Sequence, residues 1–279
     1  MHSSDTLTLL HESGAITLSS STLLVAVDDT GNESFPPSDR CFGLGGCACL
    51  VGDYGNLIEA PWETIKQDIF GGREVPMHAA EIRALTEAQM NALGKFFETN
   101  HFFRFACMAA ESAETKDDIS IVTAVGALLM ERVLDMAATA KTTEVTIIFE
   151  NSKRLSKPVF KALAGRIISD GITHNPVRVH FLPKAANSAF LEVADFVMHA
   201  AGGQLRRRVK GNYLPARKDF QSVFWRVPQH LSHHNELLRV RRVDAVGTGI
   251  TPRPPHRSVR AELPHTAPAL GTDDHPPPK

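Results

Sequence analysis

The sequence lacks the features that would assign it to a membrane, secreted or strongly charged class of protein. It has no apolar run of about 18 residues, which a membrane-spanning helix requires, so we expect no membrane span. No basic segment followed by an apolar one stands near its N-terminus, so we expect no secretory signal. Its formal net charge of −1 gives no overall reason to bind nucleic acid, and such binding would need a local basic patch.

Cysteine is also scarce. Only four cysteines are present; Cys41, Cys47 and Cys49 share one strand-like stretch, and Cys107 stands apart. A zinc site is one interpretation, but no second pair with ligand spacing follows, so we favour reduced, partly buried thiols. Reduced thiols are typical of a cytoplasmic location. The sequence has no Walker loop, no G-x-S-x-G elbow and no H-E-x-x-H helix, which argues against the activities that these motifs carry.

The sequence does contain the pattern of a globular α/β protein, with 43% hydrophobic and 22% charged residues. Apolar runs between turn residues predict strands at Leu23–Val27, Cys41–Val51, Phe102–Ala110, Val145–Phe149 and Val177–Leu182. Helical periodicity predicts helices at Pro61–Phe70, Thr86–Phe97, Ile119–Ala138, Ser156–Ser169 and Ala189–Arg207. Thr86 and Gln89 have the spacing of a capping box. This order predicts an α/β fold with a mixed five-stranded sheet, flanked by helices, and a helical insertion between the second and third strands.

Composition divides the chain into three parts. Residues 1–20 are polar and weakly patterned, which we interpret as an N-terminal extension. Residues 21–248 carry the strands and helices and form the main domain. Residues 249–279 hold eight of the 17 prolines, which predicts a disordered, proline-rich tail.

Acidic residues follow two of the apolar strands. Asp28 and Asp29 close the first strand, in LLVAVDDTG, and Glu150 closes the fourth, in EVTIIFENS. Ligands of open α/β sheets bind outside the carboxyl ends of the strands. If the first and fourth strands are parallel neighbours, Asp28 and Glu150 come within reach of a common ion.

Two further segments add chemistry-bearing side chains. Glu192, Asp195 and His199 share one face of the last helix, and His78 and Glu81 stand three residues apart in VPMHAAEIR. Each feature has a structural alternative: the two aspartates begin a turn, and Glu150 marks a strand edge that reaches water. Asp195 caps a helix or pairs with a lysine, and His78 with Glu81 forms one solvated helical turn. Taken together, acids at two strand ends and on a following helix would be a poor arrangement for solubility alone. They are a good arrangement for Mg²⁺ or Mn²⁺, because these ions prefer oxygen ligands.

These landmarks, VDDTG, MHAAE, an apolar strand ending in an acid, and NSAFLEVADF, resemble a large, mostly bacterial family catalogued as domain of unknown function 3800. The resemblance covers roughly residues 23–205 and implies a ribonuclease H-like fold. It implies that Asp28, with Asp29 beside it, Glu150 and Asp195 bind metal, and that Glu81 or His78 completes the shell or moves protons.

The sequence also departs from that family. Thr30 stands where serine is usual, Glu150 where aspartate is usual, and Glu192 where glutamine is usual. In ribonuclease H itself an acid on the first long helix completes the set, and Glu131 is the residue that would match it here. The departures motivate a rival hypothesis, in which the same fold binds nucleic acid or a protein without cutting.

A basic segment directly follows the last predicted helix. It contains Arg206, Arg207, Arg208 and Lys210, with Arg217 and Lys218 beyond them and no acid between. Such residues contact nucleic-acid phosphates without reading sequence, although cations at a helix end also complement the helix dipole. Farther on, we interpret His230, His233 and His234 as surface histidines rather than a zinc site.

The sequence thus predicts a Mg²⁺- or Mn²⁺-dependent phosphodiester hydrolase that acts on DNA or RNA. The predicted catalytic set is Asp28, His78, Glu81, Glu150 and Asp195. The predicted metal ligands are Asp28, Asp29, Glu150 and Asp195, and the predicted nucleic-acid contacts come from Arg206, Arg207, Arg208 and Lys210.

Overall fold

The structure is a computed structural model, and it describes residues 6–11, 14–31, 41–82, 85–111, 118–151, 177–183, 188–209 and 239–243. Several predicted features lie outside these residues: the helix at 156–169, the basic residues Lys210, Arg217 and Lys218, the three histidines of 230–234 and the proline-rich tail.

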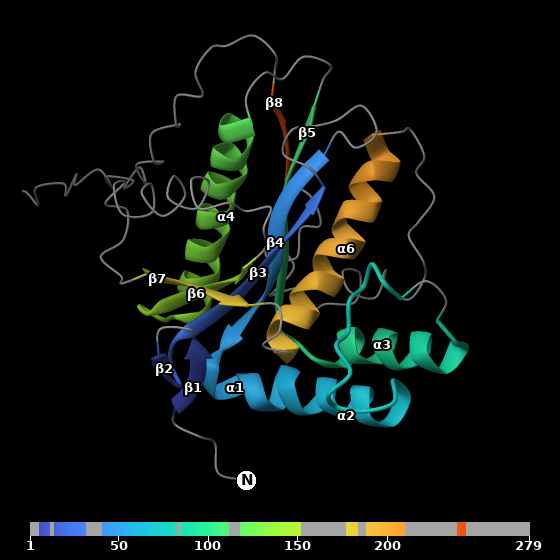
Figure 1. The fold of residues 1–279 in the computed structure, drawn as a ribbon. Helices are drawn as coiled ribbons and strands as arrows, with labels where there is room; N and C mark the ends of the chain where they lie inside the picture. Colours follow the sequence, from blue (N-terminus) through green and yellow to red (C-terminus); the bar gives the residue numbers. More distant parts are fainter. Residues whose placement is uncertain are drawn as a thin grey trace, which may run out of the picture. The chain divides into compact units, whose positions relative to one another are not determined.

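The architecture is α/β around a mixed sheet, as the sequence predicts (Figure 1). The strand order is β7-β6-β3-β4-β5-β8. The five predicted strands are β3 (Leu23–Gly31), β4 (Cys41–Leu50), β5 (Phe103–Glu111), β6 (Val145–Asn151) and β7 (Val177–Pro183). β8 (Arg239–Val243) adds a strand beside β5 that the sequence analysis did not predict. Strand β3 pairs parallel with β6, and β4 runs antiparallel to both β3 and β5.

The N-terminal extension contains a β-hairpin. β1 (Thr6–His11) pairs antiparallel with β2 (Gly14–Ser19), and the two strands form a separate small sheet. Leu18 is buried, and Leu7, Leu9 and Ile16 pack against the main core. The alternation of apolar and polar residues in each strand is the signal for this hairpin, but each stretch is only six residues long.

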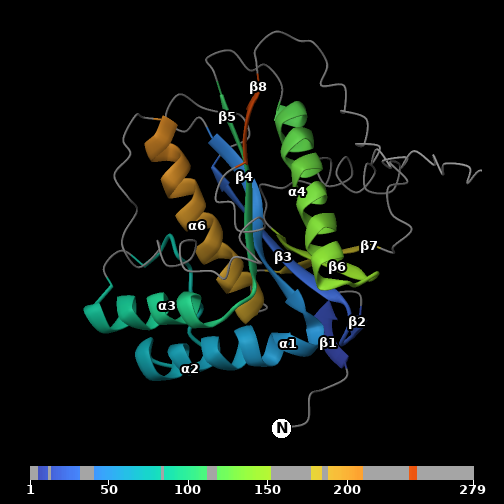
Figure 2. The same cartoon turned by 180° about the vertical axis from the view of Figure 1, so that it is seen from behind.

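Helices cover both faces of the main sheet (Figures 1 and 2). The long helix α4 (Asp118–Ala140) packs on one face, and α6 (Ala189–Val209) packs on the other. None of the described helices, α4 and α6 included, combines the length and hydropathy that a membrane crossing would need.

The predicted helical insertion follows β4. It comprises α1 (Val51–Tyr54), the π-helical turn η1 (Gly55–Glu59), α2 (Ala60–Ile69) and α3 (Glu87–Thr99). The predicted capping box starts α3: Thr86 Oγ1 accepts from the Gln89 backbone, and Gln89 Oε1 accepts from the Thr86 backbone. Trp62 of α2 lies edge-on to Phe196 of α6, with centroids 5.2 Å apart, so the insertion packs on the same side as α6.

Glycines let α6 approach the sheet closely. A Cβ atom at Gly46 of β4 would collide with the Ala26 carbonyl oxygen and lie 2.8 Å from Cβ of Ala194. A Cβ atom at Gly202 of α6 would collide with the hydroxyl of Thr30. Because the helix lies so close to β3 and β4, a polar side chain on its sheet-facing side comes near the end of β3.

Candidate functional site

Asp28 and Glu150 lie on the same face of the sheet, at the carboxyl ends of two adjacent parallel strands. The last residue pair between these strands joins Val27 of β3 to Phe149 of β6, and the two acids come next. Side chains alternate between the faces along a strand. Ala26 and Ile148 belong to the core under α6, so the acids two residues on from each also face α6. The first and fourth predicted strands, β3 and β6, are thus parallel neighbours, which is the arrangement that the sequence argument required.

The same alternation directs Asp29 to the opposite face. Its neighbour Val27 belongs to the core under α4, whereas Thr30 contacts α6 at Gly202. Glu131 is exposed on α4. Alternation therefore directs the Asp29 side chain away from the α6 side, although its charge still acts on Asp28, and Glu131 belongs to the helix on the opposite face.

Helix α6 contributes the third acid. Asp195 lines a small pocket together with Glu150 of β6, and the pocket also includes Pro76, His78, Ser188, Leu191 and Glu192. Three of the predicted site residues, His78, Glu150 and Asp195, thus come from three segments that are far apart in the sequence and border one space.

Asp28 is electrostatically linked to this group. Burial, followed by the negative charges of Asp195, Asp29 and Glu150, raises the pKa of Asp28 well above its usual value, and a hydrogen bond to the Asp29 backbone opposes the shift. The mutual repulsion of these carboxylates means that a proton or a cation near Asp28 is strongly favoured.

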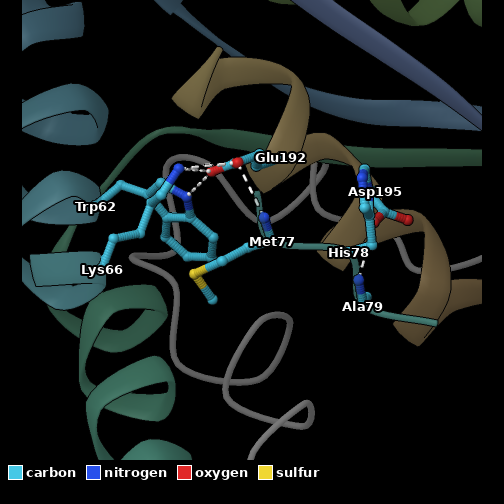
Figure 3. A network of polar contacts seen from close by, with 7 residues as sticks. All are labelled: Trp62, Lys66, Met77, His78, Ala79, Glu192 and Asp195. Atoms are coloured by element: carbon cyan, nitrogen blue, oxygen red, sulfur yellow. Dashed lines mark hydrogen bonds and ion pairs between the residues drawn. The ribbon is translucent and has the colours of Figure 1, made fainter. Parts of the chain in front are cut away.

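The segment Met77–Ala79 lies along α6 through two backbone hydrogen bonds (Figure 3). The Met77 N–H donates to Glu192 Oε1 at 3.0 Å, and the Ala79 N–H donates to Asp195 Oδ2 at 2.9 Å. Between them, His78 places its Nδ1 3.7 Å from Asp195 Oδ2. His78 and Asp195 are both partly exposed, with 17% and 19% of their side-chain surface accessible.

Glu192 occupies a buried polar network that the sequence analysis did not foresee. Its carboxylate accepts from Lys66 Nζ at 2.9 Å and from Trp62 Nε1 at 2.7 Å, in addition to the Met77 N–H. Lys66 and Glu192 expose only 3% and 6% of their side chains. The one signal in the sequence was a lysine four residues after Trp62, on the apolar face of α2, where an unpaired charge is costly.

Three further predicted residues that the structure describes, Glu81, His199 and Arg206, are exposed or only partly buried. Glu81 is exposed, and its backbone N–H donates to the His78 carbonyl oxygen. His199 is exposed on α6. Arg206 is partly buried, and its Nη2 donates to Thr30 Oγ1 at 3.5 Å, near the end of β3. Arg207 and Arg208 follow it in α6.

The donor set is chemically suited to a hard divalent cation. Carboxylate oxygens of Asp28, Glu150 and Asp195 are the ligands that Mg²⁺ and Mn²⁺ prefer, and an imidazole stands beside them. In the part of the chain that the structure describes, however, no three His, Cys, Asp or Glu side chains already stand close enough to hold a metal ion. None of the four cysteines forms a disulfide, all four are buried, and burial raises the pKa of the Cys47 thiol, which favours its protonated form.

Comparisons with known proteins did not extend this picture. No family model matches the chain. A search of curated proteins and a search of solved structures likewise gave no match. The likeness to the family named above therefore remains a hypothesis that depends on the residues quoted for it.

Proposed function

We propose that this protein is a divalent-metal-dependent phosphodiester hydrolase that acts on nucleic acid. The observation that carries the proposal is the convergence of acids from three elements on the α6 side of the sheet. Asp28 and Glu150 end adjacent parallel strands, and Glu150 shares a pocket with Asp195. Such a cluster, at the edge where α/β sheets bind their ligands, is costly unless a cation offsets its charge.

Mg²⁺ or Mn²⁺ is the cation that fits these residues. Asp28, Glu150 and Asp195 would hold it, because all three offer carboxylate oxygens on one side of the sheet. The bound ion would lower the pKa of a water molecule and offset the negative charge on the phosphoryl oxygens.

His78 is the residue we assign to proton transfer. It borders the pocket, and its Nδ1 faces Asp195 Oδ2, which leaves Nε2 as the nitrogen available to a substrate oxygen or water. Glu81 was the alternative, but it is exposed and is not among the residues that line the pocket.

The basic end of α6 supports a nucleic-acid substrate, DNA or RNA. Arg206 lies beside Thr30, two residues after Asp28, so a phosphate near this arginine is also near the acids. Arg207 and Arg208 continue the same helix, and Lys210 follows it in the sequence. Contacts of this kind give affinity that falls with salt and carry no sequence preference.

Two further assignments, the type of α/β fold and the cellular location, belong to the same proposal. A ribonuclease H-like fold is supported by the parallel pairing of β3 with β6, the antiparallel β3-β4-β5 unit and the acids at the strand ends. A cytoplasmic location is supported by four buried cysteines that form no disulfide, which suits a reducing compartment.

Calorimetric titration with Mn²⁺ tests the metal site. We expect binding to the wild-type protein and none to Asp28→Ala, with Asp68→Asn, at an exposed position on α2, as the matched control. In parallel, single-stranded, duplex and hybrid oligonucleotides are incubated with the protein and Mn²⁺. A flat titration with no cleavage of any substrate would refute the proposal.

A second candidate is a binding module with the same fold and a degraded site. It is favoured by one observation: within the described residues no ready-made group of three metal-binding side chains is present. The expected result is then salt-dependent binding of nucleic acid that weakens in Arg206→Gln, without any Mn²⁺ binding or cleavage.

A further inference from the structure

Glu192 sits in the candidate pocket but its carboxylate is committed to the protein itself. It accepts from three donors that belong to α2 and to the Met77 backbone: Lys66 Nζ, Trp62 Nε1 and the Met77 N–H. A carboxylate engaged in this way has little capacity left for a metal ion. Its place beside Asp195 therefore calls for a different explanation.

The geometry of α6 supplies that explanation (Figure 3). Glu192 and Asp195 are three residues apart and share one side of the helix. They accept from Met77 and Ala79, which are two residues apart in the chain. The residue between the two anchored amides is His78, whose Nδ1 consequently lies 3.7 Å from Asp195.

We infer that Glu192 is a positioning residue: together with Lys66 and Trp62 it fixes the segment Met77–Ala79 on α6, so that His78 faces Asp195. The catalytic meaning of this role rests on the proposed function, whereas the positioning itself does not. The ion pair with Lys66 is part of the device, because a buried carboxylate needs a compensating charge. This ion pair also explains why residue 192 is a glutamate and not the glutamine that is usual in the family that the sequence resembles.

The test uses two double variants that differ at one position. Replacing Lys66 alone or Glu192 alone strands a buried charge and risks unfolding the protein, so Lys66→Met is present in both. In Lys66→Met/Glu192→Gln the side chain keeps an oxygen that accepts from Met77. In Lys66→Met/Glu192→Leu the size and burial are similar, but no acceptor remains.

The first measurement is amide hydrogen exchange of Ala79, followed by NMR. The acceptor of this amide is Asp195, which neither variant changes. If Glu192 positions the segment, the Ala79 amide exchanges about fivefold to tenfold faster in the leucine variant than in the glutamine variant, while the thermal midpoints stay similar.

The second measurement is Mn²⁺ affinity by calorimetry. We expect it to fall about tenfold or more in the leucine variant and to be retained in the glutamine variant, as is typical when residues that orient metal ligands are lost. Equal Ala79 exchange in the two variants would overturn the inference. If the Ala79 amide exchanges faster in the leucine variant but the wild type binds no Mn²⁺, the positioning role is upheld and the proposed function is refuted.

Discussion

The α4 face and the α6 face of the central sheet are made by the same strands, yet they bury different kinds of side chain. Under α4 the core consists of apolar residues, such as Val25, Val27, Leu129 and Phe149. On the α6 side the same strands end in Asp28 and Glu150. Most of the buried charged residues also belong to this side: Lys66, Arg104, Glu150 and Glu192.

This difference teaches where stability and chemistry reside in the molecule. An apolar face contributes free energy in proportion to the surface it removes from water. Buried charges reduce the free energy of unfolding unless they are paired, so their concentration on one face points to a use other than stability. Under the proposed function, the α4 side is accordingly the scaffold, and the α6 side, together with the insertion, carries the candidate site.

The largest expected effect is on cleavage, from Asp195→Asn. The asparagine oxygen can still accept from the Ala79 N–H, so the fold should persist, but a carboxylate ligand is lost. We expect cleavage with Mn²⁺ to fall on the order of a thousandfold, beyond the 10–100-fold typical of residues outside the ligand shell. Initial rates and a thermal melt check this, and retained activity would show that Asp195 holds no ion.

Leu129→Ala addresses the scaffold face. Leu129 has no exposed surface, so its truncation should lower the free energy of unfolding by about 3 kcal/mol through lost burial and the cavity left behind. Urea denaturation measures this loss. Mn²⁺ affinity and the cleavage rate of the folded protein should stay unchanged, and a parallel loss of both would erase the distinction between the faces.

His78→Asn and Glu81→Gln form a matched pair within the insertion. Loss of a proton-transferring imidazole should lower the cleavage rate about a hundredfold, whereas the exposed Glu81 should tolerate its change. Initial cleavage rates of the two variants and of the wild type check the assignment. A larger loss of cleavage rate in Glu81→Gln than in His78→Asn would assign proton transfer to Glu81.

The smallest effect concerns pH and Asp28→Asn. Burial and the neighbouring carboxylates raise the pKa of Asp28 in the folded state, so above about pH 4 the unfolded chain releases this proton first. The stabilising contribution of protonated Asp28 is complete below the unfolded pKa and is lost as pH rises through the folded one.

In the presence of EDTA, the free energy of unfolding of the wild type should therefore decline with rising pH relative to that of Asp28→Asn. Urea titrations at several pH values between 4.5 and 8 measure the difference. Asp68→Asn is the control, and a wild type that gains stability over this range relative to Asp28→Asn would contradict the assignment.

Local signals in the sequence were sufficient for much of the fold. Five apolar runs predicted the strands, and Thr86 with Gln89 predicted the start of α3. The acids that end two strands and the acid on the last helix also predicted a shared metal site, which stays a prediction; of the three, Glu150 and Asp195 line one pocket. The hairpin of β1 and β2 escaped prediction because its alternating stretches are short and are stabilised by pairing with each other and by packing on the core.

The sequence by itself determined which segments become strands and helices, and that acids end two of the strands, because these properties depend on neighbouring residues. Only the tertiary structure decided that β3 and β6 lie side by side, which brings Asp28 near Glu150, and that Glu192 pairs with Lys66, 126 positions away in the chain. Both outcomes depend on packing between segments that are distant in the sequence, as where α6 packs closely on the sheet over Gly46 and Gly202. Contacts of that kind join surfaces that spacing along the chain does not specify.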